Sequence, residues 1–206
     1  MLKVSGLSCE RENQLLFSNL TFEVKSGSLL FVSGCNGSGK SSLLKVLAGL
    51  WLPSSGTLSW QNAPLRSEDP AFLSELLYIG HKTGIQPVLS PLQNLRWLLG
   101  LKQVPKNILA TIPGALEAFG LKEIIHSPSE YLSQGQRQRV VLTQLILVSS
   151  KCWILDEPFS GLDESGKALV AEIIKNHLVQ GGLLIMASHD AFDCGTHQKI
   201  LLRLGI

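Results

Sequence analysis

Short apolar runs separated by turn residues fill the first part of the chain. Residues 2–7, 14–17 and 20–24 have the pattern of short strands, and the polar cluster at 25–28 marks a turn. Residues 29–32 form instead an unbroken apolar run, which is typical of a strand buried on both faces. The pattern predicts an antiparallel β subdomain that leads into one strand of a buried sheet.

A helix is predicted close behind this buried strand, over residues 41–50. It ends at the Pro-Ser-Ser-Gly break within residues 51–56, after which residues 57–60 can form another edge strand. A glycine-rich loop, residues 34–40, joins the buried strand directly to this helix.

The middle of the chain, residues 87–131, is rich in leucine and has the texture of helices. Four prolines punctuate it, namely Pro91, Pro105, Pro113 and Pro128. Gly120 is placed to end a helix over residues 115–119, because glycine adopts the left-handed conformation that closes many helices. We expect a helical insertion over about residues 87–150.

Apolar strands and helices alternate in the last third of the chain. The pattern predicts helices over residues 137–148 and 164–180, and strands over residues 152–155, 183–187 and 199–204. Such alternation indicates a mostly parallel sheet covered by helices. The expected fold class is α/β, with residues 1–206 as a single domain.

Length and charge narrow the classes of function. The 206 residues suffice for one compact core with an inserted subdomain, but not for two nucleotide-binding domains in tandem. The net charge of +2 comes with no long basic run, so nucleic acid is not expected as a partner. Charged residues make up 17% of the chain, against roughly 25% in a typical soluble domain, which indicates a surface that meets another protein.

The sequence predicts no transmembrane segment. Its most apolar stretch, residues 140–148, is interrupted by Thr143 and Gln144 and falls short of the roughly 18 apolar residues that a span needs. The N-terminus lacks the pattern of a signal segment, so a cytoplasmic chain is expected. The 4 cysteines stand singly, which argues against a zinc site or a disulfide scaffold.

The glycine-rich loop after the buried strand has the spacing of a P-loop. Its glycines let backbone N–H groups turn towards phosphates at a helix N-terminus, while Lys40 reaches the β- and γ-phosphates and Ser41 can ligate Mg²⁺. The predicted nucleotide-binding residues are Gly34, Cys35, Asn36, Gly37, Ser38, Gly39, Lys40, Ser41 and Ser42. The strand before the loop and the helix after it favour a nucleotide site.

Two carboxylates end the strand predicted over residues 152–155. In an open α/β sheet, ligands bind at the C-terminal ends of the strands. Asp156 is therefore expected to help hold Mg²⁺. Glu157 is expected to be the general base that polarises the attacking water, a role that contributes about 10²- to 10⁴-fold in rate.

A second glycine-containing turn precedes the helix predicted over residues 137–148. Its residues are Leu132, Ser133, Gln134, Gly135 and Gln136. Ser133 can cap that helix while Gly135 exposes backbone N–H groups to an anion. The turn is a second candidate phosphate site, without a lysine of its own.

Together these motifs resemble those of the ATP-binding-cassette (ABC) ATPases. The P-loop, the LSQGQ turn, the Ile-Leu-Asp-Glu-Pro run, Ser-Gly-Leu-Asp at 160–163 and Ser-His-Asp at 188–190 stand in that family's order and spacing. The resemblance covers essentially the whole chain. It implies ATP and Mg²⁺ as cofactors, and ATP hydrolysis as the activity.

The resemblance also implies a homodimer that sandwiches two ATP molecules. Each ATP would meet the P-loop of one chain and the signature residues Ser133 and Gly135 of the other, and one copy of each half-site per chain fits two-fold symmetry. By the same resemblance His189 contacts the γ-phosphate. Asp163 matches the loop that crosses the dimer interface, and it can also cap the helix that follows.

Three positions depart from the family's usual residues. Gln134 stands where the usual signature has glycine. His81 occupies the place of a glutamine that links Mg²⁺ to the membrane partner, so the expected metal set is Ser41, Asp156 and His81. Arg11 takes the position of the aromatic residue that stacks on adenine, and its planar guanidinium can stack instead.

A narrower resemblance, to ATP-binding subunits of haem exporters in cytochrome c maturation, rests on chain length, on residues 80–85 and 94–97, and on the run from Trp153. It implies integral membrane subunits that handle haem as partners, and a peripheral position at the cytoplasmic face of the inner membrane. Hydrolysis would then drive haem export or the release of a haem chaperone. The helical insertion, with His81 and residues 89–101, is the predicted docking face.

Other classes remain open at this stage. The chain could serve another small exporter, such as one for a lipoprotein or a drug, and its membrane partners would decide this. A soluble ABC ATPase that acts as a mechanical switch usually carries tandem cassettes, long insertions or basic faces, none of which is present here. A P-loop kinase would give no reason for the LSQGQ turn.

Overall fold

The computed structural model describes residues 1–189 and 192–205, so Asp190 of the Ser-His-Asp run lies outside the described residues. The chain divides into two compact units, which are described separately. The first comprises Met1–Gly80, Ser150–Glu157 and Ile174–Ile206, and the second comprises His81–Ser149 and Pro158–Ile173.

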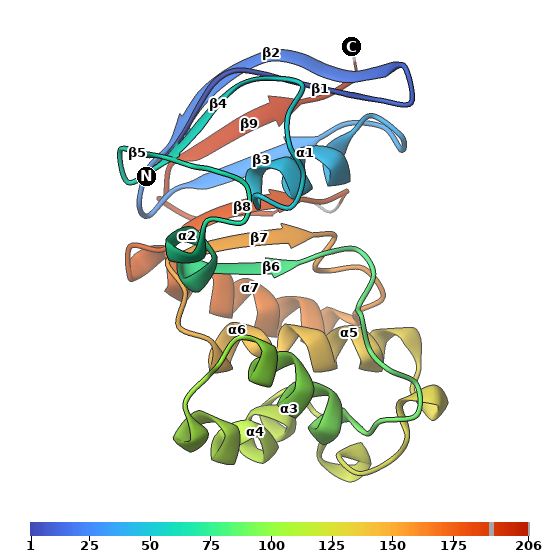
Figure 1. Cartoon of the computed structure of the whole chain (residues 1–206). Coiled ribbons are helices and arrows are strands. Elements are labelled where there is room, and N and C mark those ends of the chain that lie inside the picture. Colours follow the sequence, from blue (N-terminus) through green and yellow to red (C-terminus); the bar gives the residue numbers. More distant parts are fainter. Residues whose placement is uncertain (190–191, 206) are drawn as a thin grey trace. The chain divides into compact units, whose positions relative to one another are not determined.

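The first unit contains an antiparallel sheet in the order β2-β1-β4-β5, which confirms the expected subdomain (Figure 1). Its strands are β1 (Leu2–Arg11), β2 (Gln14–Val24), β4 (Ser55–Trp60) and β5 (Ala63–Pro64). Residues 14–24 form one strand and not two, because an irregularity in the β1–β2 ladder absorbs Asn19 at a φ of 51°. The short β5 makes β4 an inner strand, where an edge strand was expected.

The predicted parallel sheet is the second sheet of this unit, and its strand order, β6-β7-β8-β3-β9, includes the strand β6 that the sequence did not predict. Its strands are β3 (Leu29–Ser33), β6 (Leu76–Ile79), β7 (Cys152–Asp156), β8 (Leu183–Ala187) and β9 (Lys199–Arg203). All residues of β7 and β8 are buried, which agrees with their apolar sequences, and Asp156 at the end of β7 is the one charged residue among them. Because the strands are parallel, their carboxyl ends meet at one edge.

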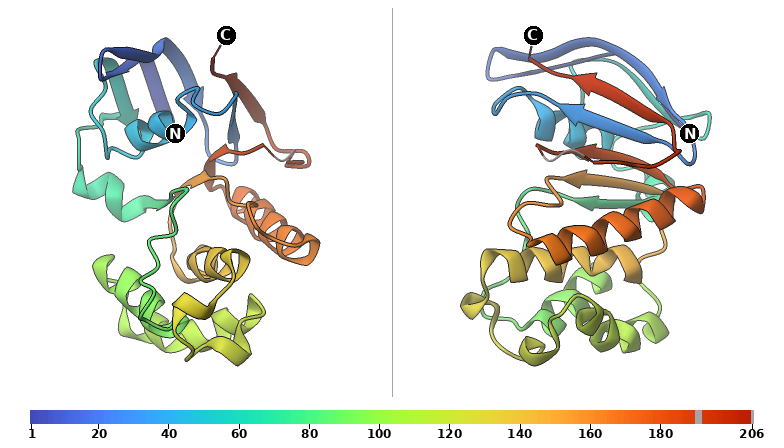
Figure 2. Two further views of the ribbon diagram at one scale, coloured as in Figure 1. Left: turned by 90° about the vertical axis from the view of Figure 1, so that its right-hand side faces the viewer. Right: turned by 180° about the vertical axis from the view of Figure 1, so that it is seen from behind.

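Helix α1 (Lys40–Leu47) lies between the two sheets of the first unit (Figures 1 and 2). Its residues Leu43, Leu44 and Leu47 are fully buried in a core shared with side chains of both sheets. The helix stops before the predicted end at residue 50, because Gly49 adopts a φ of 72°. A short helix, α2 (Pro70–Glu75), is capped by Asp69 and leads into β6.

Helix α7 (Glu164–Val179) begins in the second unit and ends in the first. Near its C-terminal end the His177 ring stacks on the Trp153 ring of β7, with centroids 3.7 Å apart and an angle of 3° between the planes. His177 Nε2 lies 3.3 Å from Leu183 O. This buried stack ties the last turns of α7 to the sheet.

The second unit is helical. It contains α3 (Pro91–Leu101), α4 (Lys106–Ala118), the 3₁₀ turns η1 (Lys122–Ile124) and η2 (Ser129–Tyr131), α5 (Gln134–Leu142) and α6 (Gln144–Leu147). Pro113 lies inside α4, whereas the sequence indicated a break there. Gly120 follows the end of α4 at a φ of 71°, as predicted.

The single helix expected over residues 137–148 is two helices that meet at Thr143. The Thr143 hydroxyl donates to Arg139 O at 2.8 Å, a back-bond that bends helices. The first of them starts earlier than predicted, at Gln134, because Ser133 caps it. Within residues 1–189 and 192–205, no helix has the length and hydropathy needed to cross a membrane.

Candidate nucleotide site and signature turn

The predicted P-loop joins the end of β3 to the start of α1. Gly37 and Gly39 have φ values of 82° and 92°, in the left-handed region that favours glycine. A Cβ at Gly39 would also lie 3.3 Å from Leu16 O. Both glycines are therefore needed for the conformation of this loop. The loop leads into the N-terminus of α1, where backbone N–H groups are free to bind an anion.

Lys40 is buried although it carries a charge. Its Nζ donates to Gly34 O at 2.8 Å and to Cys35 O at 3.0 Å, so the ammonium group is held against the loop. Ser41 and Ser42 follow in the first turn of α1 and are half-buried. The predicted residues thus form one continuous segment around the N-terminus of α1, with the Lys40 ammonium group against the loop.

Asp156 ends β7 beside Ala187 of β8. Its side chain is buried, and among the described residues Asp156 Oδ2 has no hydrogen-bond partner. A buried carboxylate oxygen in this state is costly unless another group engages it. Since Mg²⁺ binds through carboxylate and hydroxyl oxygens, the chemistry of Asp156 fits a magnesium ligand.

Glu157 has a φ of 53°, which is uncommon for a residue other than glycine. Its N–H donates to Ala187 O at 2.8 Å, and its Oε2 accepts the His189 N–H at 3.2 Å. His189 Nε2 lies 3.5 Å from Glu157 Oε1 and 3.0 Å from Asn36 Oδ1. Asn36, Glu157 and His189 therefore meet at one edge of the first unit. The sequence predicted all three for the ATP site but not their direct contacts.

Tyr78 is a polar residue of this edge that sequence reasoning missed. It lies on β6 beside Ile154 of β7. A Cβ at Gly80 would lie 2.9 Å from Tyr78 Oη, so glycine makes room for the phenol. Burial, and then the charge of Asp156, raises the pKa of Tyr78 to about 12. The phenol therefore stays protonated at neutral pH.

Arg11, the predicted adenine-stacking residue, lies at the exposed tip of the β1–β2 hairpin. Its guanidinium carbon is 4.3 Å from the ring centroid of Trp51, and Lys45 Nζ is 4.5 Å from the same centroid. Trp51 was treated in the sequence only as part of a helix break. Stacking of Arg11 on a base stays a prediction.

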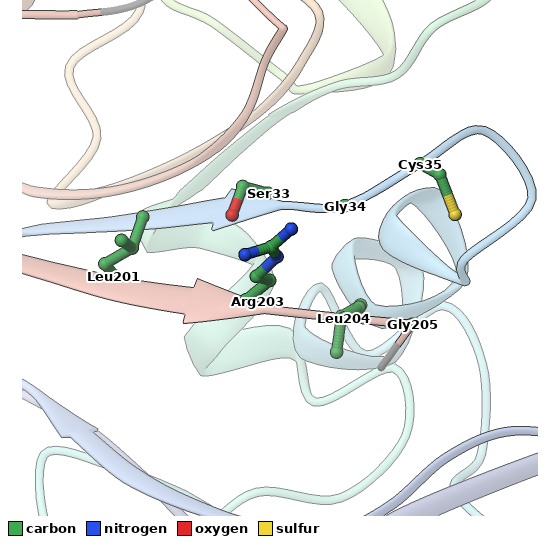
Figure 3. A pocket seen from close by; sticks show the side chains of 7 residues that line it. All are labelled: Ser33, Gly34, Cys35, Leu201, Arg203, Leu204 and Gly205. Carbon is green, nitrogen blue, oxygen red and sulfur yellow. The ribbon is translucent and has the colours of Figure 1, made fainter.

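A cavity of about 360 Å³ borders the first residues of the P-loop, beside the ends of β3 and β9 (Figure 3). Its lining includes Arg203, Cys35 and Ser33. Cys35 is exposed, and its thiol is free. Arg203 was not singled out from the sequence, because β9 carries no motif that marks it.

The LSQGQ turn lies in the second unit, where Ser133 forms a capping box with Gln136. Gln136 N donates to Ser133 Oγ at 3.2 Å, and Ser133 N donates to Gln136 Oε1 at 2.9 Å. The predicted cap is therefore confirmed. Gly135 packs against the segment after Pro158, since a Cβ at Gly135 would lie 2.3 Å from Gly161 O.

Asp163 accepts the Gly166 N–H at 2.9 Å and so caps α7, as expected. The Gly166 N–H, and next the Arg139 guanidinium, hold the pKa of Asp163 below its usual range. Arg139 is a partner that the sequence did not suggest. His81 is the first residue of the second unit and is exposed, and its proposed metal role stays a prediction.

The sequence pattern of the family described as ABC transporter matches residues 17–160. The chain belongs to this family and is an ATP-binding subunit with the ATPase activity of its class.

Its relatives narrow the comparison further. The cytochrome c biogenesis ATP-binding export protein CcmA of Cupriavidus necator is 43% identical over 192 residues, which cover 92% of this chain and 83% of the relative. The protein of the same name from Methylococcus capsulatus is 43% identical over 192 residues, or 93% of this chain and 92% of the relative.

Solved structures show the same fold. An ATP binding subunit of an ABC transporter gives a TM-score of 0.85 at 24% identity, covering 99% of this chain and 88% of that chain. The dimeric structure of a bacterial ABC transporter cassette gives a TM-score of 0.85 at 20% identity, covering 98% of this chain and 94% of that chain. Both similarities extend over nearly the whole chain.

Proposed function

We propose that this chain is the ATP-hydrolysing subunit of a membrane ABC complex that serves cytochrome c biogenesis, where ATP hydrolysis drives haem export or the release of a haem chaperone. The grouping of Asn36, Glu157 and His189 beside the P-loop carries the ATPase part of the proposal. The relatives, which are 43% identical to this chain over 192 residues, support its assignment to cytochrome c biogenesis.

The triphosphate binds along the P-loop, residues 34–42. Backbone N–H groups at the start of α1 and the Lys40 ammonium neutralise its charge. Ser41 and Asp156 would hold Mg²⁺, which would neutralise charge on the β- and γ-phosphates. Arg11, backed by the Trp51 ring at 4.3 Å, stacks on the adenine.

Glu157 is the general base for hydrolysis. Its carboxylate takes a proton from the water that attacks the γ-phosphorus, so that the new P–O bond forms as the bond to the β-phosphate oxygen breaks. His189 contacts the γ-phosphate and stabilises the charge that develops there. The contacts of His189 with Glu157 and Asn36 orient both the base and the imidazole.

A two-fold homodimer completes each site. Ser133 and Gly135 of one chain bind the γ-phosphate held by the P-loop of the other, and Leu132, Gln134 and Gln136 frame that turn. Asp163 lies on the loop that crosses the interface and couples the two sites. Because each chain has one P-loop and one signature turn, two chains form two equivalent sites.

The chain acts as a single ABC ATPase domain with its helical insertion over about residues 87–150. This insertion docks on integral membrane subunits at the cytoplasmic face of the inner membrane. Large apolar side chains of the second unit support a docking surface, since Val88, Trp97 and Leu101 are 76%, 45% and 66% exposed.

The test of the ATPase proposal is Glu157→Gln in the purified full chain. The variant is expected to bind ATP with unchanged affinity, to lose at least about a hundredfold in kcat, and to sediment as a dimer with Mg²⁺ and ATP. Lys40→Ala is the matched control for binding. Lys40→Ala should lower the affinity for ATP about 10- to 100-fold, because a charged hydrogen bond contributes about 1.5–3 kcal/mol. Wild-type turnover by Glu157→Gln would refute the assigned base.

Co-purification from native membranes tests the partners. Integral membrane subunits should co-purify with the wild-type chain, and the purified material should show the absorption spectrum of haem. Leu101→Asp should abolish this, whereas Leu201→Asp, at a position 65% exposed on β9, should not. Equal recovery of membrane subunits with both variants would show that the docking surface lies elsewhere.

A further inference from the structure

Arg139 connects three segments of the second unit through one side chain. It lies on α5, shortly after the signature turn, and its side chain is 20% exposed. Nη1 donates to Phe119 O at 3.1 Å, at the C-terminal end of α4. Nη2 donates to Asp163 Oδ1 and forms an ion pair with it. The planar guanidinium allows both contacts at once, because its N–H groups point in fixed, divergent directions.

Two glycines make room for this guanidinium. A Cβ at Gly120 would lie 3.0 Å from Arg139 Nη1, and a Cβ at Gly166 would lie 3.2 Å from Nη2. The group is therefore enclosed by the end of α4 and the first turn of α7. The Arg139 end of the salt bridge is fixed by this packing and by the bond to Phe119 O, while the Asp163 side chain is 65% exposed.

Asp163 receives the guanidinium on an oxygen that already organises α7. Oδ1 accepts the Gly166 N–H at 2.9 Å and the Ser165 hydroxyl at 3.1 Å. The Gly166 N–H and the Arg139 guanidinium lower the pKa of Asp163, as expected when both groups contact the ionised carboxylate. The residue that caps α7 is thus also the anchor for Arg139.

Neighbouring contacts tie the same two segments together. Gly135 approaches Gly161 so closely that a Cβ would lie 2.3 Å from Gly161 O. One turn further along α5, Gln138 Nε2 donates to Pro158 O at 3.4 Å. Helix α5 and residues 158–163 are therefore in contact at successive turns of the helix, and Arg139 adds a charged contact.

We propose that Arg139 is a positioning residue that holds the signature turn and the Asp163 loop as one body. This inference rests on the proposed function, in which Ser133 and Gly135 serve the ATP of the other chain and Asp163 crosses the same interface. With Arg139 in place, the two segments reach the partner together. Without it, α5 can tilt while residues 158–163 stay with α7, and the two trans contacts no longer form at the same time.

The first test measures backbone hydrogen exchange in the full chain. Arg139→Ala should speed exchange about tenfold or more at residues 133–136 and 158–166 together. Arg137→Ala is the matched control on the same helix, because Arg137 donates to Ser129 O at 3.0 Å and Glu130 O at 2.9 Å. It should leave residues 158–166 unchanged. Unchanged exchange at these residues in Arg139→Ala would overturn the proposal.

The second test separates positioning from simple destabilisation. Arg139→Ala should lower kcat about tenfold or more without changing ATP binding to the P-loop, and Arg139→Lys should recover part of kcat. Asp163→Ala should cost less in kcat when added to Arg139→Ala than when made in the wild-type chain, because the contact between the two residues is already lost. Fully additive losses in kcat would contradict the proposal.

The two tests distinguish this inference from the proposed function. If Glu157→Gln with intact Arg139 does not dimerise on ATP, the two-chain site fails. The exchange measurement still decides whether Arg139 joins the two segments, because it needs no second chain.

Discussion

Glu157 combines an unusual backbone conformation with a carboxylate that contacts His189. Its φ of 53° costs about 1–3 kcal/mol in a residue other than glycine and persists only where the surroundings enforce it. Here the enforcing contacts are the bond to Ala187 O at 2.8 Å and the His189 N–H at 3.2 Å. Strain at this position is consistent with a carboxylate whose exact placement matters for the reaction.

Asn36 is the residue-scale prediction that follows from this grouping. Asn36→Ala removes the Oδ1 atom that lies 3.0 Å from His189 Nε2, so the imidazole loses one of its two side-chain contacts. We expect kcat to fall about fivefold, since one hydrogen bond contributes about 1 kcal/mol, with little change in ATP affinity. Cys35→Ser, at the exposed neighbouring position, is the control. A kcat equal to that of the control would disprove the role of Asn36.

Single residues of the site could be predicted, but their mutual contacts could not. Asp156 and Glu157 were found from a buried strand that ends in carboxylates, and Lys40 from its spacing to two glycines. The link between Asn36 and His189 joins residues 153 positions apart, and no local pattern encodes it. The phenol of Tyr78 was missed for the same reason, because its place in the sheet depends on the pairing of β6 with β7.

At the scale of elements, helix α5 and the segment 158–163 depend on glycine for their contact. Gly135 is part of helix α5, and only glycine fits there, because a Cβ would lie 2.3 Å from Gly161 O. The sequence indicated only that Gly135 exposes backbone to an anion. The packing reason became clear when the neighbouring segment was placed.

Gly135→Ala should therefore act in the opposite direction from Gly114→Ala. The first forces α5 away from Gly161 and should cost about 1–3 kcal/mol of stability together with most of the ATPase activity. The second lies in α4, where a Cβ meets nothing within 4 Å, and should stabilise by up to about 1 kcal/mol. Thermal unfolding and kcat of both variants measure this. A Gly135→Ala chain as stable and active as wild type would contradict the packing.

The mostly parallel sheet and the helical insertion followed from the sequence, while the strand order, the strand β6 and the ends of elements did not. Buried parallel strands β7 and β8 were placed correctly because nothing polar interrupts them. The division between α5 and α6 at Thr143 was missed, since an apolar helical pattern continues through it and only the bond to Arg139 O marks the bend.

At the scale of the whole molecule, the buried stack of His177 on Trp153 predicts how stability depends on pH. Burial lowers the pKa of His177 from 6.5 to about 4. Above pH 6.5 the ring is neutral in the folded and unfolded chain alike. As the pH falls from 6.5 to about 4, the unfolded chain binds a proton that the folded chain excludes, so stability is lost, by up to about 3 kcal/mol.

The measurement is the free energy of unfolding of wild type and His177→Phe across this range. Phenylalanine keeps an aromatic ring on Trp153 but cannot bind a proton. The free energy of unfolding of wild type minus that of His177→Phe should fall steadily from pH 6.5 to pH 4. A constant difference would mean that His177 is not buried in its neutral form.

The residues for ATP and those for the signature lie in different units of one chain, so each half-site can be altered alone. The central claim is that these half-sites meet between two chains. The most direct measurement is an experimental structure of Glu157→Gln with Mg²⁺ and ATP. We predict two ATP molecules, each on the P-loop of one chain, with Ser133 and Gly135 of the other chain about 3 Å from the γ-phosphate. ATP bound with Ser133 of both chains distant from every γ-phosphate would contradict the claim.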